Sequence, residues 1–162
     1  MKQMPFLMLL ALMPMLISCD AKKPKVDAHE ACMAGNGVYC FSAGLNAYTS
    51  KVSDNKELAV QYMKRACDLG DGAGCSFWAA TINRSDATTQ SELGVALGLF
   101  RKGCELGDFA GCEAASEMLL IGRGSQPDLN MAHRYHLKAL ELNGEDPKTG
   151  TKYKKMLQSI NE

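Results

Sequence analysis

The chain has 162 residues, a length that suits one domain, and its 18 Lys and Arg residues balance 18 Asp and Glu residues. This net charge of zero argues against a protein that relies on a basic surface to hold nucleic acid or acidic lipid. The seven cysteines are the most informative part of the composition, because their spacing is regular.

The start of the chain has the organisation of an export signal. Lys2 precedes an uncharged stretch, rich in Met, Leu and Ala, that runs from Met4 to Ile17. A basic start followed by an apolar region is typical of a signal peptide. The run is shorter than the about 20 apolar residues of a membrane-spanning helix. We therefore predict a lipoprotein signal peptide over residues 1–18.

The last residues of this region, Leu16-Ile17-Ser18-Cys19, resemble a bacterial lipobox. In a lipobox the cysteine is lipidated and becomes the first residue of the mature protein; the alternative is an ordinary signal peptide with a chance cysteine nearby. The Lys- and Pro-containing stretch that follows has a composition that resists folding. Residues 19–26 are thus interpreted as a lipidated tether.

Asp20 stands directly after Cys19. This pair resembles the signal that retains lipoproteins in the inner membrane of enteric bacteria. The resemblance implies a protein anchored by its lipid in the bacterial cell envelope and facing the periplasm, with the inner membrane favoured over the outer.

The six other cysteines form three pairs with identical spacing: Cys32 and Cys40, Cys67 and Cys75, and Cys104 and Cys112. The first members of successive pairs lie 35 and 37 positions apart, a period typical of stacked repeats. In an exported protein, regularly spaced cysteines in even number predict disulfides. A zinc site would use Cys-x-x-Cys ligand pairs, which the chain lacks, and His29 is a weak hint of a metal. We predict three disulfides, no metal and no cofactor.

Helical periodicity precedes the second and third cysteine pairs. Ala59, Met63 and Ala66 align with Ala96, Phe100 and Gly103, which gives the i, i+4, i+7 spacing of one helical face. Residues that cap helix starts come before each run, at positions 53–55 and 88–91. Each run is therefore predicted to form a helix.

Both helices are expected to end at a Leu-Gly-Asp sequence, where Gly70 and Gly107 are able to take positive φ. A second apolar stretch follows over residues 73–82 and 109–121. The repeating unit is thus a helix, a tight turn and a second helix, with one cysteine on each side of the turn. Such a reversal brings two α-carbons within the about 4.4–6.8 Å that a disulfide needs.

The two ends of the array depart from this unit. Residues 27–34 are expected to form a short helix that leads into the first cysteine pair. A helix from Asp128 to Leu142 continues the apolar pattern, but Leu140 stands where the other units have a cysteine. Residues 147–160 are expected to form a closing helix.

Helix pairs of this size bury their apolar faces only by stacking. The sequence therefore predicts an all-α fold: a disulfide-stapled α/α solenoid over residues 27–162, with about three repeats and a C-terminal capping helix.

The ACDLGDGAGC block, the Gly122-Arg123-Gly124 loop and the repeat period resemble Sel-one-like repeats, which are relatives of the tetratricopeptide repeat (TPR). The chain is most similar to a bacterial secreted, cysteine-rich subgroup, whose repeats carry one helix-to-helix disulfide. It departs from that pattern in its degenerate first unit and its cysteine-free last unit. The resemblance implies a right-handed superhelix whose concave face binds other proteins.

The same resemblance implies an enzymatic alternative, because β-lactamase or penicillin-binding activity has been attributed to the cysteine-rich subgroup. Residues 53–56 read as both Ser-x-x-Lys and Ser-Asp-Asn, and residues 148–150 read Lys-Thr-Gly. A serine β-lactamase needs these motifs as separate elements, whereas here two of them share Ser53. We interpret residues 53–56 as a helix cap and residues 148–150 as a polar connection, so we predict no catalytic residues.

His133 and His136 lie three positions apart on a predicted helix, a spacing that could share a metal. No acidic or cysteine partner is predicted nearby. We expect His133 to be exposed and His136 to be partly buried.

Aromatic residues gather on the second helices, which line the concave face in TPR-like stacks. Most are expected to pack between repeats, and an exposed remainder to bind a partner, because aromatic side chains dominate protein-binding hot spots. The candidate partner-binding residues are Phe41, Tyr48, Phe77 and Trp78. The predicted function is non-enzymatic protein binding. Similarity to some periplasmic immunity lipoproteins implies an inhibitor of a toxin; envelope assembly and regulation of sensor proteins remain alternatives.

Overall fold

The computed structural model describes residues 26–50, 55–84 and 88–144, which form seven α-helices and contain no β-strand. The helices are α1 (Ala28–Met33), α2 (Gly37–Thr49), α3 (Asn55–Asp68), α4 (Gly72–Asn83), α5 (Gln90–Glu105), α6 (Phe109–Ile121) and α7 (Leu129–Leu142). The predicted all-α class is confirmed. The signal peptide, Cys19 with its tether, and the closing helix over residues 147–160 lie outside the described residues.

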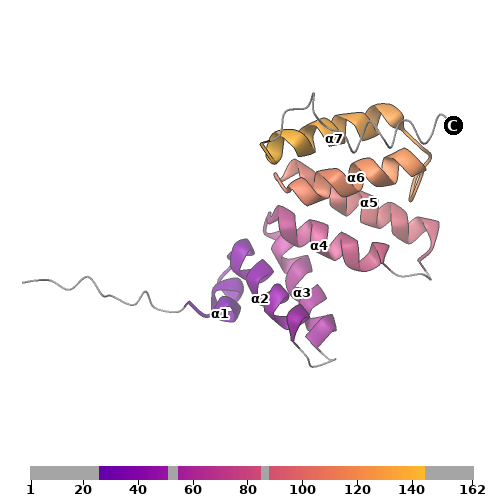
Figure 1. Cartoon of the computed structure of the whole chain (residues 1–162). Helices are drawn as coiled ribbons and strands as arrows, with labels where there is room; N and C mark the ends of the chain where they lie inside the picture. The colour runs from indigo at the N-terminus through magenta and orange to yellow at the C-terminus, as the bar shows by residue number, and fades with distance from the viewer. Residues whose placement is uncertain (1–25, 51–54, 85–87, 145–162) are drawn as a thin grey trace, which may run out of the picture.

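Helical hairpins stack in chain order, as Figure 1 shows. The hairpins are α1–α2, α3–α4 and α5–α6, and the last helix of each packs against the first helix of the next element, ending with α6 against α7. Contacts also join α2 to α4, α4 to α6, and α5 to α7. The second helices α2, α4 and α6 therefore lie next to one another along one side of a solenoid, and its main core cluster is shared by α4 to α7.

The same hydrogen bonds close the turn inside the second and third hairpins. The backbone N–H of Asp71 donates to the carbonyl of Ala66 at 2.9 Å, and the Asp71 carboxylate accepts from the N–H of Gly74 at 2.7 Å. Asp108 repeats both bonds in the third hairpin, so each turn aspartate ends one helix and caps the next. The turn glycines Gly70 and Gly107 have φ of 85° and 89°, which confirms the predicted left-handed positions.

A disulfide joins the two helices of each hairpin across its turn. The α-carbons are 4.4 Å apart for Cys32–Cys40 and 4.5 Å apart for Cys67–Cys75 and Cys104–Cys112, and the predicted pairing is confirmed. All six cysteines are buried, with no more than 1% of any residue exposed. On the chain-entropy view, closing so short a loop contributes roughly 2.5 kcal/mol per bridge.

The helices of a hairpin approach so closely that some positions must be glycine. A Cβ added at Gly74 would lie 2.5 Å from the Cβ of Ala66. A Cβ at Gly111 would lie 2.8 Å from the backbone nitrogen of Cys104 and 2.8 Å from the carbonyl oxygen of Phe100. Since these obstacles lie on or next to the backbone of the facing helix, a larger residue would push the helices apart.

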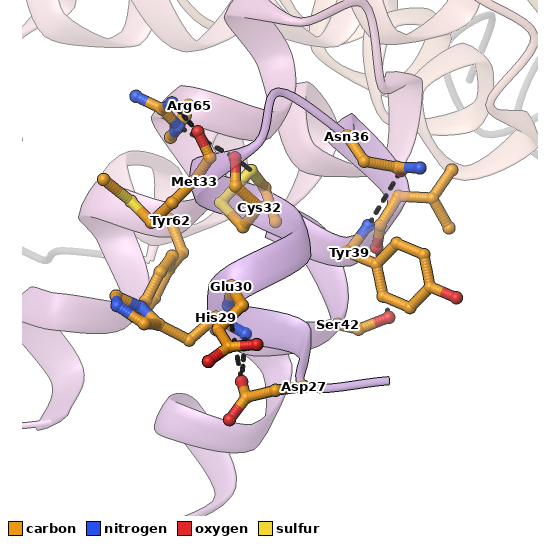
Figure 2. The surroundings of a disulfide bond; sticks show 12 residues. Asp27, His29, Glu30, Cys32, Met33, Asn36, Tyr39, Ser42, Tyr62 and Arg65 are labelled. Carbon is orange, nitrogen blue, oxygen red and sulfur yellow. Dashed lines mark hydrogen bonds between the residues drawn. A yellow bond between two sulfur atoms is a disulfide. The ribbon is translucent and has the colours of Figure 1, made fainter. Parts of the chain in front are cut away.

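Side chains of α3 hold the short first helix in place (Figure 2). Arg65 donates from Nε to the carbonyl of Cys32 and from Nη2 to the carbonyl of Met33, both at 3.3 Å. These carbonyls belong to the last turn of α1, where a helix leaves such groups without internal partners. Nδ1 of His29 lies 2.6 Å from the hydroxyl of Tyr62, so His29 contributes to this packing. The short helix predicted over residues 27–34 is confirmed as α1.

Helix α5 begins with a capping box within the region predicted to cap it. The hydroxyl of Thr89 accepts from the backbone N–H of Glu92 at 3.2 Å, and the Glu92 carboxylate accepts from the backbone N–H of Thr89 at 2.8 Å. The backbone and hydroxyl hydrogen bonds from Thr89 lower the pKa of Glu92. At the other predicted cap, α3 begins at Asn55, while Ser53 and Asp54 lie outside the described residues.

Helix α7 begins after the cap residue Asp128 and continues the apolar pattern. His133 is exposed, as predicted, whereas His136, which was expected to be partly buried, is buried. Leu140 is buried at the position where earlier repeats place a cysteine. Over the described ranges, no group of three His, Cys, Asp or Glu residues could hold a metal ion.

The close packing of the hairpins gives a matched pair of glycine substitutions. Gly111→Ala should lower the free energy of unfolding by about 1–3 kcal/mol, because the new methyl group meets backbone atoms. Gly98→Ala should raise it by about 1 kcal/mol, because Gly98 lies in helix α5 with nothing within 4 Å of an added Cβ. Urea unfolding of both variants measures the difference, and equal effects would contradict the close approach of α5 and α6.

A candidate binding groove between α4 and α6

An open apolar groove runs between α4 and α6, which lie side by side in the stack (Figure 1). Its volume is about 360 Å³. The side chains that line it come from four helices: Phe41 of α2; Ala73, Ser76, Phe77 and Ala80 of α4; Phe100 of α5; and Ala110 and Ala114 of α6, with the cap residue Asp108 at one end. A concave, mostly apolar space of this size is typical of a site that takes a small group or a side chain.

We call the space between two successive second helices an interval. The groove exists because small residues stand in the α4–α6 interval at positions that hold bulky residues in the α2–α4 interval. Between α2 and α4, Phe41 and Phe77 meet edge to face with their ring centroids 6.4 Å apart. Counted from the second cysteine of each repeat, Phe41 corresponds to Ser76, and Phe77 corresponds to Ala114. The interval between α4 and α6 therefore lacks the aromatic pair that fills the interval before it.

A smaller cavity of about 110 Å³ shares one lining residue, Ala114, with the groove. It is lined by Asn83 at the end of α4, by Glu117 of α6, and by Arg123 in the loop that follows α6, together with apolar side chains. Oδ1 of Asn83 and Nε of Arg123 are both buried, and neither has a hydrogen-bond partner among the described residues. Less than 1 Å² of either atom is accessible, so both atoms lie beneath the surface of the cavity and are closed to solvent.

The loop after α6 fixes the position of Arg123. Gly122 ends the helix in the left-handed conformation with φ 71°, and the backbone N–H of Arg123 donates to the carbonyl of Met118 at 2.8 Å. Nη2 of Arg123 then donates to the backbone carbonyl of Asn83 at 2.9 Å. The N–H of Gly124 donates to the side chain of Gln90 at 2.9 Å. Residues 122–124 form an inter-helix turn, as predicted, and this turn also carries the guanidinium group to the groove.

The side of the solenoid that bears the groove is almost free of charge. Helices α2 and α4 contain no charged residue, and α6 contains only Glu113 and Glu117. The first-type helices α3, α5 and α7 carry the Lys and Arg residues of the described helices. A charged ligand would therefore find few opposite charges on the groove side.

The four predicted partner-binding residues divide between two places. Phe41 and Phe77 line the groove, and Tyr48 lies against Phe77 with ring centroids 4.9 Å apart. The Tyr48 hydroxyl accepts from Arg84 at 2.9 Å. Trp78 lies apart from this group, with the ammonium group of Lys64 on α3 5.1 Å from its ring centroid.

Most residues that line the groove and the smaller cavity were not among the sequence candidates, and Ser76 and Ala114 are the two that leave the space open. Both residues are small, and small residues are not selected as candidates for binding from sequence alone. Their signal in the sequence was the alignment of the repeats, in which Ser76 and Ala114 replace phenylalanines.

The motifs of the enzymatic alternative lie mostly outside the described residues. Asn55 and Lys56 start helix α3, while Ser53, Asp54 and residues 148–150 lie outside the described residues. None of the described helices combines the length and the apolar character needed to cross a membrane.

Comparison with protein families matches the Sel1 repeat over residues 31–71, 92–108 and 110–144. Among solved structures, the cysteine-rich protein B of Helicobacter pylori is 26% identical, with a TM-score of 0.57, over 74% of this chain and 86% of that chain. A Sel1 repeat protein from Oxalobacter formigenes is 21% identical, with a TM-score of 0.59, over 80% of this chain and 98% of that chain, and this likeness shows the fold alone. No curated protein matches the chain.

The correspondence between repeats predicts that Ala114→Phe fills the groove without unfolding the protein. By analogy with Phe77, the new ring should lie over Ser76, and the free energy of unfolding should stay within about 1 kcal/mol of the parent or rise, because apolar area is buried. Ala115→Phe is the matched control, since Ala115 is 0% exposed and a ring there overfills the core. Urea unfolding should show a marked loss for the control only; a comparable loss in Ala114→Phe would contradict the presence of an open groove.

Proposed function

Because this chain belongs to the Sel1 repeat family, we propose that it is a non-enzymatic module that binds a protein partner through the α4–α6 groove. Sel1 repeat proteins are generally protein-interaction scaffolds, which supports the class of function but not the identity of the partner. The single observation that supports this site is that the α4–α6 interval lacks the aromatic pair, Phe41 and Phe77, that fills the α2–α4 interval. A pocket of this kind receives an anchoring side chain of a partner.

The proposed module is carried outside the cytoplasm. Three buried disulfides are typical of proteins that fold in an oxidising compartment. We propose that residues 1–18 are a lipoprotein signal peptide, that residues 19–26 are a tether lipidated at Cys19, and that residues 27–162 form the repeat domain with its capping helix. The protein would then face the periplasm from a membrane, with the inner membrane favoured because Asp20 follows Cys19. Several acyl chains hold a protein more firmly than one.

A more specific version of the proposal is an immunity protein that blocks a toxic enzyme acting in the periplasm. Such an inhibitor needs a rigid surface, resistance to oxidation and no reaction of its own. The disulfide in each described hairpin and the nearly uncharged groove side suit this role. Envelope assembly and regulation of sensor proteins are the alternative roles within the same class of function.

The proposed binding through the groove predicts that Ala114→Phe abolishes binding of the partner protein. The oxidised chain and this variant are used in parallel as bait for a periplasmic extract of the native organism. A protein retained by the parent and lost from the variant is the expected result, because the ring occupies the space of the partner's side chain. Val95→Ala on α5, an exposed position, is the control that should retain the partner. Retention of the same proteins by all three baits would place binding elsewhere.

The non-enzymatic assignment is tested with the chromogenic β-lactam nitrocefin. The purified oxidised chain should give no hydrolysis above the rate in buffer, because its candidate motifs share one serine. Turnover that disappears in Ser53→Ala would establish the enzymatic alternative instead.

The lipid anchor predicts that Cys19→Ser abolishes incorporation of labelled palmitate and moves the protein from the membrane fraction to the soluble periplasmic fraction. Cys32→Ser is a useful comparison, because it breaks a disulfide and leaves the lipobox intact. Labelling that persists in Cys19→Ser would refute the lipobox.

A further inference from the structure

We infer that the α4–α6 groove receives a phenylalanine side chain of a partner protein, in a partner segment that carries a basic residue next to that phenylalanine. The inference rests on the proposed protein-binding function and adds the class of side chain that the groove recognises. It follows from the ring that fills the preceding interval and from the charge at one end of the groove.

The α2–α4 interval shows which group fills a space of this shape. There the ring of Phe77, on α4, meets Phe41 of α2 edge to face, with ring centroids 6.4 Å apart. In the α4–α6 interval the same two positions hold Ala114 on α6 and Ser76 on α4. All three hairpins have the same disulfide, so the two intervals have the same frame. A ring supplied by a partner therefore finds over Ser76 and Ala114 the place that the Phe77 ring takes one repeat earlier.

The wall of the groove is accessible to such a ring. Phe77 is partly exposed, as are three of the four alanines that line the groove, and the fourth alanine, Ala110, is exposed. A ring in the groove buries apolar area against these methyl groups. It also has the Phe77 ring as a neighbour, and aromatic pairs are stabilised beyond the burial of their area. An aromatic side chain is therefore favoured over an aliphatic one of similar size.

Charge selects the residue next to the ring. Among the described residues that line the groove, Asp108 alone is charged, and it is partly exposed. Helix α6 adds Glu113 and Glu117. Arg84 and Arg123 follow the C-terminal ends of α4 and α6, away from Asp108 at the start of α6. A Lys or Arg next to the ring therefore suits the Asp108 end, whereas an Asp or Glu meets like charge there.

Recognition of a ring is tested with acetylated and amidated peptides of Ser and Gly that carry one Phe next to one Lys. Matched peptides replace Phe by cyclohexylalanine, which has a similar size and no aromatic electrons, or by Ala. NMR titration of the oxidised chain, labelled with carbon-13 in its alanine methyl groups, reports binding at the groove alanines. The Phe peptide should shift these methyl signals by its ring current and bind roughly threefold or more tightly than the cyclohexylalanine peptide, because of the aromatic pair. Binding of the cyclohexylalanine peptide that is as tight or tighter would overturn the inference.

The variant Ala114→Phe places the ring in the protein itself. It should abolish the methyl shifts and the binding of the Phe peptide, because its own ring occupies the space. Val95→Ala, at an exposed position of α5, should bind the Phe peptide as the parent does. The peptide with Ala in place of Phe should not bind the parent. Unchanged binding of the Phe peptide to Ala114→Phe would place the ring elsewhere and contradict the inference.

The basic neighbour is tested by exchanging Lys for Glu in the Phe peptide, on either side of the ring. At low salt the Lys peptide should bind roughly threefold or more tightly than the Glu peptide, and added salt should reduce this ratio by screening. Asp108→Asn should lower the ratio by half or more, because Asn caps a helix as Asp does but carries no charge. Asp71→Asn is the matched control, since Asp71 caps α4 in the same way and is not among the residues that line the groove. Equal effects of the two variants would show that Asp108 does not select the neighbour, against the inference.

The same peptides separate the two levels of the proposal. If the Phe and cyclohexylalanine peptides bind equally and Ala114→Phe abolishes the binding of both, the groove is the binding site and the ring preference is wrong. If no peptide binds the parent, the inference fails as a whole. The bait experiment then decides independently whether the proposed protein-binding function survives at another surface.

Discussion

The short turn between the two helices of each hairpin is the constraint on which the rest of the structure depends. Only seven residues separate the cysteines of a pair, and the disulfide between them holds the α-carbons no more than 4.5 Å apart. Helices held this closely at one end must also approach closely along their length, which requires glycine at positions such as Gly74 and Gly111. In return, each bridge restricts the unfolded chain, which matters in a small domain whose core contains many alanines.

A unit held so uniformly leaves little freedom in its backbone, so differences between repeats arise in the side chains. The interval between α2 and α4 is closed by Phe41 and Phe77, while the next interval is open because Ser76 and Ala114 occupy the same positions. The disulfide and turn are equal in both repeats. Two substitutions on a constant frame are therefore sufficient to create a groove, and relatives with the same frame can differ in what they bind.

The distribution of charge separates the two sides of the solenoid. Lys and Arg residues gather on α3, α5 and α7, whereas the helices of the groove side carry few charges. An open apolar space with few charges around it is suited to a side chain of a partner and poorly suited to nucleic acid, which presents negative phosphate groups.

The sequence by itself determined the repeat, the helices, the turns and the disulfide pairing, because each depends on residues close together in the chain. The spacing of Cys67 and Cys75, the glycine of the turn and the helical period are all local signals. The sequence also indicated aromatic residues of the second helices as candidates, but it did not separate Phe77, in the groove, from Trp78, which lies against Lys64. Only the tertiary structure decided which interval is open and which distant residues meet at its end. Asn83 and Arg123 are 40 positions apart, and only the packing of α6 on α4 leaves the polar atoms of both side chains buried at one place.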